Sequence, residues 1–161
     1  MIHSQLYIDY IRQLTQAREL LLNERMIKGA PAGDDGAWSA LDSICRRLVG
    51  VPHKVVRRTS PDRLRDLIRS GGHANISLIL VGELLRQDVE LSEKIGNVSQ
   101  ATVSRLQAFC LLIDSLSFLE PEEQTEYRKK LDVLAAELES TSDDPYLRNK
   151  IESYRSMKFS A

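Results

Sequence analysis

The chain has 161 residues, of which 42% are hydrophobic, 28% charged and 6% aromatic, and its formal net charge is −1. This length fits one domain, residues 1–161, and the composition excludes a disordered chain and is typical of a soluble helical protein. The longest apolar run, residues 76–85, is far shorter than a membrane span, which takes about 20 residues. Residues 1–5 do not begin a signal peptide. We therefore expect a cytoplasmic protein with no membrane partner.

Apolar residues recur at helical spacing along nearly the whole chain. The first predicted helix covers residues 4–28 and ends before Gly29. A second helix begins at Asp34 or Asp35, because aspartate caps helix N-termini well. It ends at Gly50, the residue type that most often follows the last turn of a helix.

The next segment, residues 51–58, is predicted to be a short helical or irregular turn. A helix after it has the clearest start signal in the chain. Thr59 or Ser60 is placed as its cap and Pro61 at its first position, where proline costs no hydrogen bond. The glycines at 71 and 72 end this helix.

The two helices in the middle of the chain are the most apolar. The first, residues 74–95, is apolar nearly all round and is therefore expected at the centre of the fold. The second, residues 99–118, carries three apolar side chains that we expect to be buried: Val103, Leu106 and Phe109.

An amphipathic helix is predicted for residues 121–139, and Asp144 and Pro145 begin a last helix. No segment alternates polar and apolar residues as a strand does. The sequence therefore predicts an all-α bundle of about seven or eight helices, arranged as antiparallel hairpins.

Residues 91–106 fit two different structures. The glycine turn and the serine-led helix after it resemble the helix-turn-helix of bacterial repressors, which implies a DNA-binding regulator. Those motifs have one residue between the glycine and the serine cap, whereas Asn97 and Val98 both lie there in this chain. One extra residue rotates the second helix by about 100°. Arg105 is also the only basic residue of that helix, whereas DNA readers present several.

The second interpretation is the tight turn of a tetratricopeptide-like hairpin. Gly96, Asn97, Ala101 and Ala108 fall where such a repeat places its turn residues and its small residues. The chain as a whole resembles a family of small bacterial all-helical proteins with hairpins of this kind and no assigned activity. Four segments carry the resemblance, in this order: residues 9–14, 48–52, 59–64 and 80–85. The resemblance implies a fold and a bacterial cytoplasmic setting, and no reaction.

No residue pattern predicts catalysis, a cofactor or a metal. Cys45 and Cys110 lie inside amphipathic patterns, and we expect both to be reduced core thiols. His3, His53 and His73 are scattered and do not combine with Cys, Asp or Glu at metal-ligand spacing. Phosphate-binding glycine loops and nucleophile motifs are absent from the sequence.

Charge is unevenly distributed, with basic residues between 46 and 69 and acidic residues between 114 and 144. Such asymmetry lets two parts of one molecule, or two subunits, attract each other. Seven cations form a candidate partner-binding strip: Arg46, Arg47, Lys54, Arg57, Arg58, Arg63 and Arg65. The strip suits an acidic peptide, a nucleic-acid backbone or the acidic third of another subunit. The alternative is a solvated face whose arginines pair locally with Asp42, Asp62 and Asp66.

From these patterns we expect a non-enzymatic protein–protein interaction or scaffold module. Its partner is an unidentified protein or peptide, and it forms a homodimer through leftover apolar surface. The alternative is a DNA-binding transcriptional regulator that uses a helix-turn-helix at residues 91–106. We favour protein over nucleic acid as the partner.

Overall fold

The computed structural model describes residues 35–69 and 74–157, together with positions 5, 8, 9, 12, 15 and 16. Within these residues the chain forms seven α-helices and no strand, which confirms the predicted all-α bundle. The predicted helix at residues 4–28 lies outside the described residues, apart from those six positions, which are helical.

The helices follow the predicted order closely. They are α2 (Asp35–Leu48), α3 (His53–Val56), α4 (Pro61–Arg69), α5 (Ala74–Lys94), α6 (Val98–Ser115), α7 (Pro121–Thr141) and α8 (Pro145–Ser156). The end of α6 differs from the prediction: the helix ends at Ser115, because residues 116–118 tighten into a short 3₁₀ helix, η1 (Leu116–Phe118).

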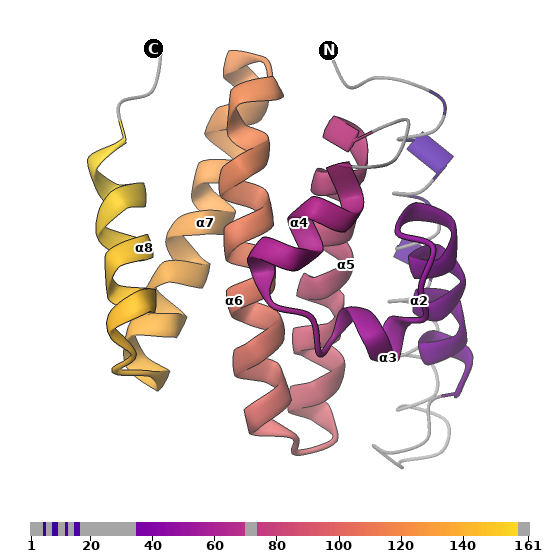
Figure 1. Cartoon of the computed structure of the whole chain (residues 1–161). Helices are drawn as coiled ribbons and strands as arrows, with labels where there is room; N and C mark the ends of the chain where they lie inside the picture. Colours follow the sequence, from indigo (N-terminus) through magenta and orange to yellow (C-terminus); the bar gives the residue numbers. More distant parts are fainter. Residues whose placement is uncertain are drawn as a thin grey trace.

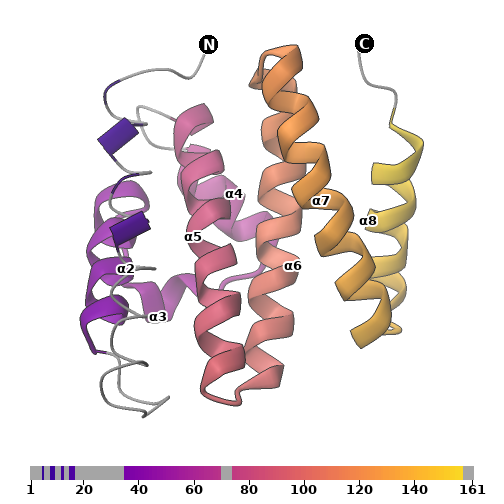
Figure 2. The ribbon, with the colours of Figure 1, turned by 180° about the vertical axis from the view of Figure 1, so that it is seen from behind.

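Helices α5 to α8 run alternately down and up, and α5 and α6 lie side by side as an antiparallel hairpin at the centre (Figure 1). The hairpin is flanked by α2 on the α5 side and by α7 and α8 on the α6 side. Helices α3 and α4 cross one face of the hairpin, and the view from behind shows the opposite face of α5 and α6 in front of them (Figure 2). Every residue from 77 to 85 on α5 is buried, which confirms this helix as the centre of the fold.

The turn between α5 and α6 begins one residue earlier than expected. Gly96 adopts a φ of 81°, which glycine reaches without strain, and the side chain of Asn97 accepts a hydrogen bond from the backbone N–H of Gln100 at 3.1 Å. Asn97 is therefore the cap and α6 begins at Val98. The prediction of a helix starting at Ser99, with an extra residue in the turn, was wrong.

The N-terminal part of α6 also differs from the expected burial pattern. Phe109 is fully buried and Leu106 half-buried, but Val103 is 45% exposed, so its predicted burial was wrong. Val103 lies on the side of α6 that also exposes Ser99, four residues earlier. Arg105 is only 4% exposed, because it lies between the carboxylates of Glu93 on α5 (3.2 Å) and Glu137 on α7 (3.6 Å).

Close packing of α5 against α6 depends on a glycine. A Cβ atom at Gly82 would lie 2.7 Å from Cδ2 and 2.8 Å from Cγ of Leu112, which is fully buried on α6. Real Cβ atoms do not come this close to another side chain, and buried Leu112 has little room to move. Gly82 therefore fixes how closely the two central helices approach.

We expect Gly82→Ala to lower the free energy of unfolding by about 1 kcal/mol, because overpacking costs about 1–3 kcal/mol and alanine regains about 1 kcal/mol of helix propensity. Urea unfolding followed by circular dichroism measures this change. In a Leu112→Ala background the added methyl group has space, so the same substitution should there be neutral or stabilising. An equal loss in both backgrounds would contradict the packing argument.

Candidate functional site

The α3–α4 segment is built from short-range signals in the sequence. Pro52 is extended (φ −63°, ψ 154°) and precedes the four-residue helix α3. The Thr59 hydroxyl donates to the carbonyl oxygen of Val55 at 2.7 Å, so Thr59 closes α3 and its hydroxyl is not a cap for α4. Pro61 begins α4 as predicted, and the carbonyl of Ser60 accepts a hydrogen bond from the backbone N–H of Leu64 at 2.9 Å. Of the two residues that the sequence offers as a cap, Ser60 is therefore the one that directly precedes α4.

An open recess of about 990 Å³ lies between α3 and α4. We call it the basic basin. Eight residues line it: Lys54, Val55, Arg58, Thr59, Ser60, Arg63, Asp66 and Leu67. Helices α3 and α4, whose residues line the recess, cross the central hairpin on one face of the molecule (Figure 1).

The basic basin combines charge with exposed apolar surface. Lys54, Arg58 and Arg63 are exposed, and none of the three forms an ion pair with another residue in the described ranges. Val55 is 40% exposed and Leu67 41%, although both are aliphatic. The sides of α3 and α4 that face the hairpin carry the buried residues of these helices, so the basin is lined by their outward faces.

Only part of the predicted basic strip contributes to this recess. Three of its arginines are held by acids: Arg46 by Asp42 at 2.8 Å, Arg57 by Asp88 at 2.8 Å, and Arg65 by Asp62 at 3.6 Å and Asp114 at 3.4 Å. Arg47 is exposed on α2 and does not line the basin. The strip therefore divides into three arginines paired with acids, the three basin cations, and Arg47, which lies outside the basin.

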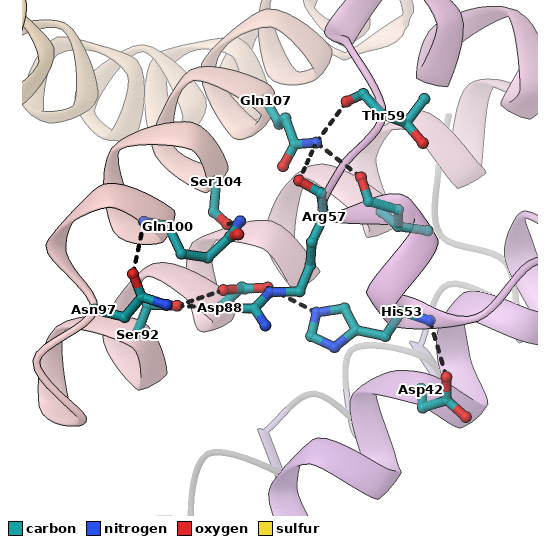
Figure 3. Close-up of polar contacts among 11 residues, drawn as sticks. Asp42, His53, Arg57, Thr59, Asp88, Ser92, Asn97, Gln100, Ser104 and Gln107 are labelled. Atoms are coloured by element: carbon teal, nitrogen blue, oxygen red, sulfur yellow. Dashed lines mark hydrogen bonds and ion pairs between the residues drawn. The ribbon is translucent and has the colours of Figure 1, made fainter. Parts of the chain in front are cut away.

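A buried polar cluster lies beside the basin. The ring Nε2 of His53 is 2.7 Å from Oδ2 of Asp88, and Nε of Arg57 is 2.8 Å from the same oxygen. The Ser92 hydroxyl donates to Oδ1 of Asp88 at 2.8 Å and accepts from Nη2 of Arg57 at 3.0 Å (Figure 3). We call these four residues the Asp88 cluster. It ties α3 and the residue after it to α5.

The Asp88 cluster is also packed against an aromatic ring. The Trp38 ring on α2 stacks on His53, with 5.5 Å between ring centroids, and the Arg57 guanidinium lies 4.9 Å from the Trp38 ring centroid. Burial by itself raises the pKa of Asp88, but the hydrogen bond and charge of His53, followed by the charge of Arg57, outweigh it. The pKa of Asp88 is therefore below its ordinary value, and the carboxylate is charged at neutral pH.

The cluster contains the residue types of a hydrolytic triad, but in a different arrangement. Ser92 donates to Asp88 instead of His53, and both Ser92 and Asp88 are fully buried. A nucleophile needs a base beside it and access to a substrate. We interpret the Asp88 cluster as a structural ion-pair group.

Both cysteines lie in the core, as expected from the sequence. Cys45 and Cys110 are free and buried, and burial raises the pKa of both thiols, to about 12 for Cys110. Such thiols are unreactive at neutral pH. Among the described residues no group of three His, Cys, Asp or Glu side chains is placed to hold a metal ion. No helix in the same residues is long and apolar enough to cross a membrane.

Sequence reasoning missed the partner of His53. Asp88 is a charged residue inside a long helix that is apolar nearly all round. A carboxylate in such a position needs a cation or several hydrogen-bond donors, because burying it alone is very unfavourable. That was the signal that could have led to the Asp88 cluster.

Comparison with known proteins adds no family to these observations: no protein-family model matches the chain, and no match was found among curated proteins or solved structures.

The lowered pKa of Asp88 predicts a specific dependence of stability on pH. Because the pKa in the folded state is below that in the unfolded chain, the contribution is complete above about pH 4 and is lost as the pH falls further. Asp88→Asn leaves His53 and Arg57 without their carboxylate, and we expect it to cost about 3 kcal/mol at pH 7.

Urea unfolding between about pH 3 and pH 7, followed by circular dichroism, measures both effects. Asp88→Asn should lose less stability than the wild type on acidification, because the titrating group is gone. Asp143→Asn, at a carboxylate whose side chain is 94% exposed, is the control and should follow the wild type. Parallel wild-type and Asp88→Asn curves below pH 4 would show that Asp88 is not the group responsible.

Proposed function

We propose that this chain is a non-enzymatic protein-interaction module, and that its basic basin binds an acidic segment of a partner protein. One observation carries the proposal: three exposed cations surround two exposed aliphatic side chains, Val55 and Leu67, in a single recess. Arg46, in contrast, is paired locally with Asp42.

The two kinds of side chain have different roles in such binding. Burial of Val55 and Leu67 against an apolar side chain of the partner contributes affinity, because removing apolar surface from water is favourable. Lys54, Arg58 and Arg63 at the rim attract carboxylates and reject basic segments. The ligand that fits is an acidic segment with at least one large aliphatic residue.

The charge distribution favours a protein segment over a nucleic-acid backbone. Nucleic-acid sites need several cations along a path of phosphates, whereas the basin has three and also contains Asp66 beside Leu67. In the alternative helix-turn-helix at residues 91–106, the one arginine of the second helix, Arg105, is buried between two glutamates. DNA binding is therefore treated as an outcome of the test below.

We favour a different protein over a second copy of this chain. Two carboxylates of the acidic C-terminal third already have cations: Glu139 is bonded to Arg155 at 2.6 Å and Asp143 to Arg148 at 3.0 Å. The exposed face of α7 also carries Lys129 beside its acids. These groups complement the basin poorly, so the homodimer expected from the sequence is the second choice of occupant.

The setting that we propose is the bacterial cytoplasm, where the free thiols of Cys45 and Cys110 stay reduced. We also propose that α5 and α6 are a tetratricopeptide-like hairpin. Buried small residues at Gly82, Ala101 and Ala108 support this, because they let two helices approach closely.

The proposal predicts binding of an amphipathic acidic peptide. The probe is a fluorescein-labelled peptide with glutamates and leucines at helical spacing, followed by fluorescence anisotropy. We expect a Kd of about 10 μM and a loss of about 100-fold for the triple variant Lys54→Glu, Arg58→Glu, Arg63→Glu. Val55→Ala with Leu67→Ala, which leaves the charge unchanged, should weaken binding about tenfold.

The matched control reverses three cations on α7 and α8, in the variant Arg128→Glu, Lys129→Glu, Arg148→Glu, which changes the net charge equally. It should bind within about threefold of the wild type after correction for long-range charge effects. Equal losses in the two triple variants would contradict a site at the basin. Tighter binding of a labelled DNA duplex than of the peptide would overturn the choice of a protein partner, and concentration-dependent self-association that the basin variant abolishes would favour a second copy.

A further inference from the structure

The basic basin owes its shape to a stretch of chain with little regular structure of its own. Lys54 and Val55 lie on α3, which has four residues, Arg58 lies on the connection, and Leu67 lies on α4. A single helical turn is not stable alone. The placement of α3 relative to α4 therefore depends on contacts with the central hairpin.

The buried side chain of Gln107 on α6 makes such contacts with three residues at and after the end of α3. Nε2 of Gln107 lies 2.8 Å from the carbonyl oxygen of Val56, 2.7 Å from that of Thr59 and 3.3 Å from that of Arg57 (Figure 3). The side chain is 1% exposed, so water does not compete for these bonds. An amide nitrogen carries two hydrogens, so Gln107 donates to Val56 and Thr59, and the carbonyl of Arg57 shares one of these donors.

The carbonyl of Val56 also accepts from the backbone N–H of Thr59 at 3.1 Å, and Gln107 gives it a second donor. Gln107 supplies a donor as well to the carbonyls of Arg57 and Thr59, just after the end of α3. The last carbonyls of a helix have no acceptor role inside it, and a buried carbonyl without a donor is strongly unfavourable. Gln107 thus both permits this end of α3 to be buried and ties it to α6. Arg58 lies between the tied residues Arg57 and Thr59, which fixes the backbone from which its exposed guanidinium projects.

The Asp88 cluster holds a different part of the same segment. It fixes the His53 ring at the start of α3 and the Arg57 side chain at its end, both against α5. Gln107 instead holds the backbone of residues 56–59 against α6. The step from α3 to α4, and with it the spacing across the basin, is set by Gln107.

We infer that Gln107 is a positioning residue of the basic basin: it does not line the recess, and it sets the separation of Lys54 and Val55 on α3 from Arg63 and Leu67 on α4. The identity of the ligand rests on the proposed function. The hydrogen bonds by which Gln107 holds the connection between α3 and α4 do not depend on the proposed function.

The structure offers a closely matched control for this inference. Nε2 of Gln124 donates to the carbonyl oxygens of Leu116 at 3.0 Å and Leu119 at 3.1 Å, at the connection between α6 and α7 and outside the basin. Gln107→Met removes a buried donor to backbone carbonyls and Gln124→Met a half-buried one, and both variants keep the volume of the side chain. A purely structural role predicts similar effects for the two variants.

The experiment measures affinity for the acidic peptide probe and, without peptide, hydrogen exchange of the backbone amides of residues 57–59, which are hydrogen-bonded in the wild type. We expect Gln107→Met to bind at least about tenfold more weakly and to exchange these amides faster. Gln124→Met should bind within about twofold of the wild type and leave these amides protected. Gln107→Asn, which keeps the donor but is one methylene shorter, should fall between the wild type and Gln107→Met and serves if the latter does not fold.

The possible failures are distinguishable. A Gln107→Met protein that binds the probe as tightly as the wild type overturns the positioning role and leaves the proposed function intact. A wild-type protein that does not bind the probe overturns the proposed function. In that case unchanged exchange at residues 57–59 in Gln107→Met would also overturn the inference, and faster exchange would support the hold on the connection.

Discussion

Close contact between α5 and α6 is the constraint on which the rest of the molecule depends. At Gly82 the two helices lie so close together that there is no space for a methyl group between them, and the residues around this contact are buried on both helices. Polar groups placed on such a hairpin must find partners within the protein, because water does not reach them. Asp88, Ser92 and Gln107 meet this requirement by bonding to the α3 segment and the residues just after it. The hairpin thereby determines where α3 and α4 lie, and the basic basin forms on their outer side.

Local signals in the sequence were sufficient for the helices themselves. Pro61 marked the first residue of α4, Gly96 marked the turn after α5, and Asp144 caps α8 through a hydrogen bond from the backbone N–H of Tyr146. These features depend on residues a few positions apart, so a single sequence contains them. The start of α6 was misplaced by one residue because Asn97 and Ser99 are both good caps, and only the geometry of the turn selects Asn97.

The candidate site was predictable only in part, because its decisive contacts link helices that are distant in the sequence. The basic strip was recognised from its arginines, but the partners of Arg57 and Arg65 include Asp88 and Asp114, which lie on α5 and α6. Which cations remain exposed depends on how α3 and α4 lie on the hairpin, and periodicity does not encode that placement. Val103 is a second case in which periodicity was insufficient. Its spacing indicated a buried position, yet its side chain is exposed on α6.

Gln107 is buried beneath the basin, whereas the exposed cations line it, and this separation of roles affects how the surface can change in evolution. The bonds that shape the basin go from a buried side chain to backbone carbonyls, and every residue type carries a backbone carbonyl. Positions such as Lys54, Arg58 and Arg63 are thus free to change charge or size without disturbing the anchor beneath them. Under the proposed function, binding preference and folding are encoded by separate residues, so that substitutions on the surface change specificity and leave stability nearly unchanged.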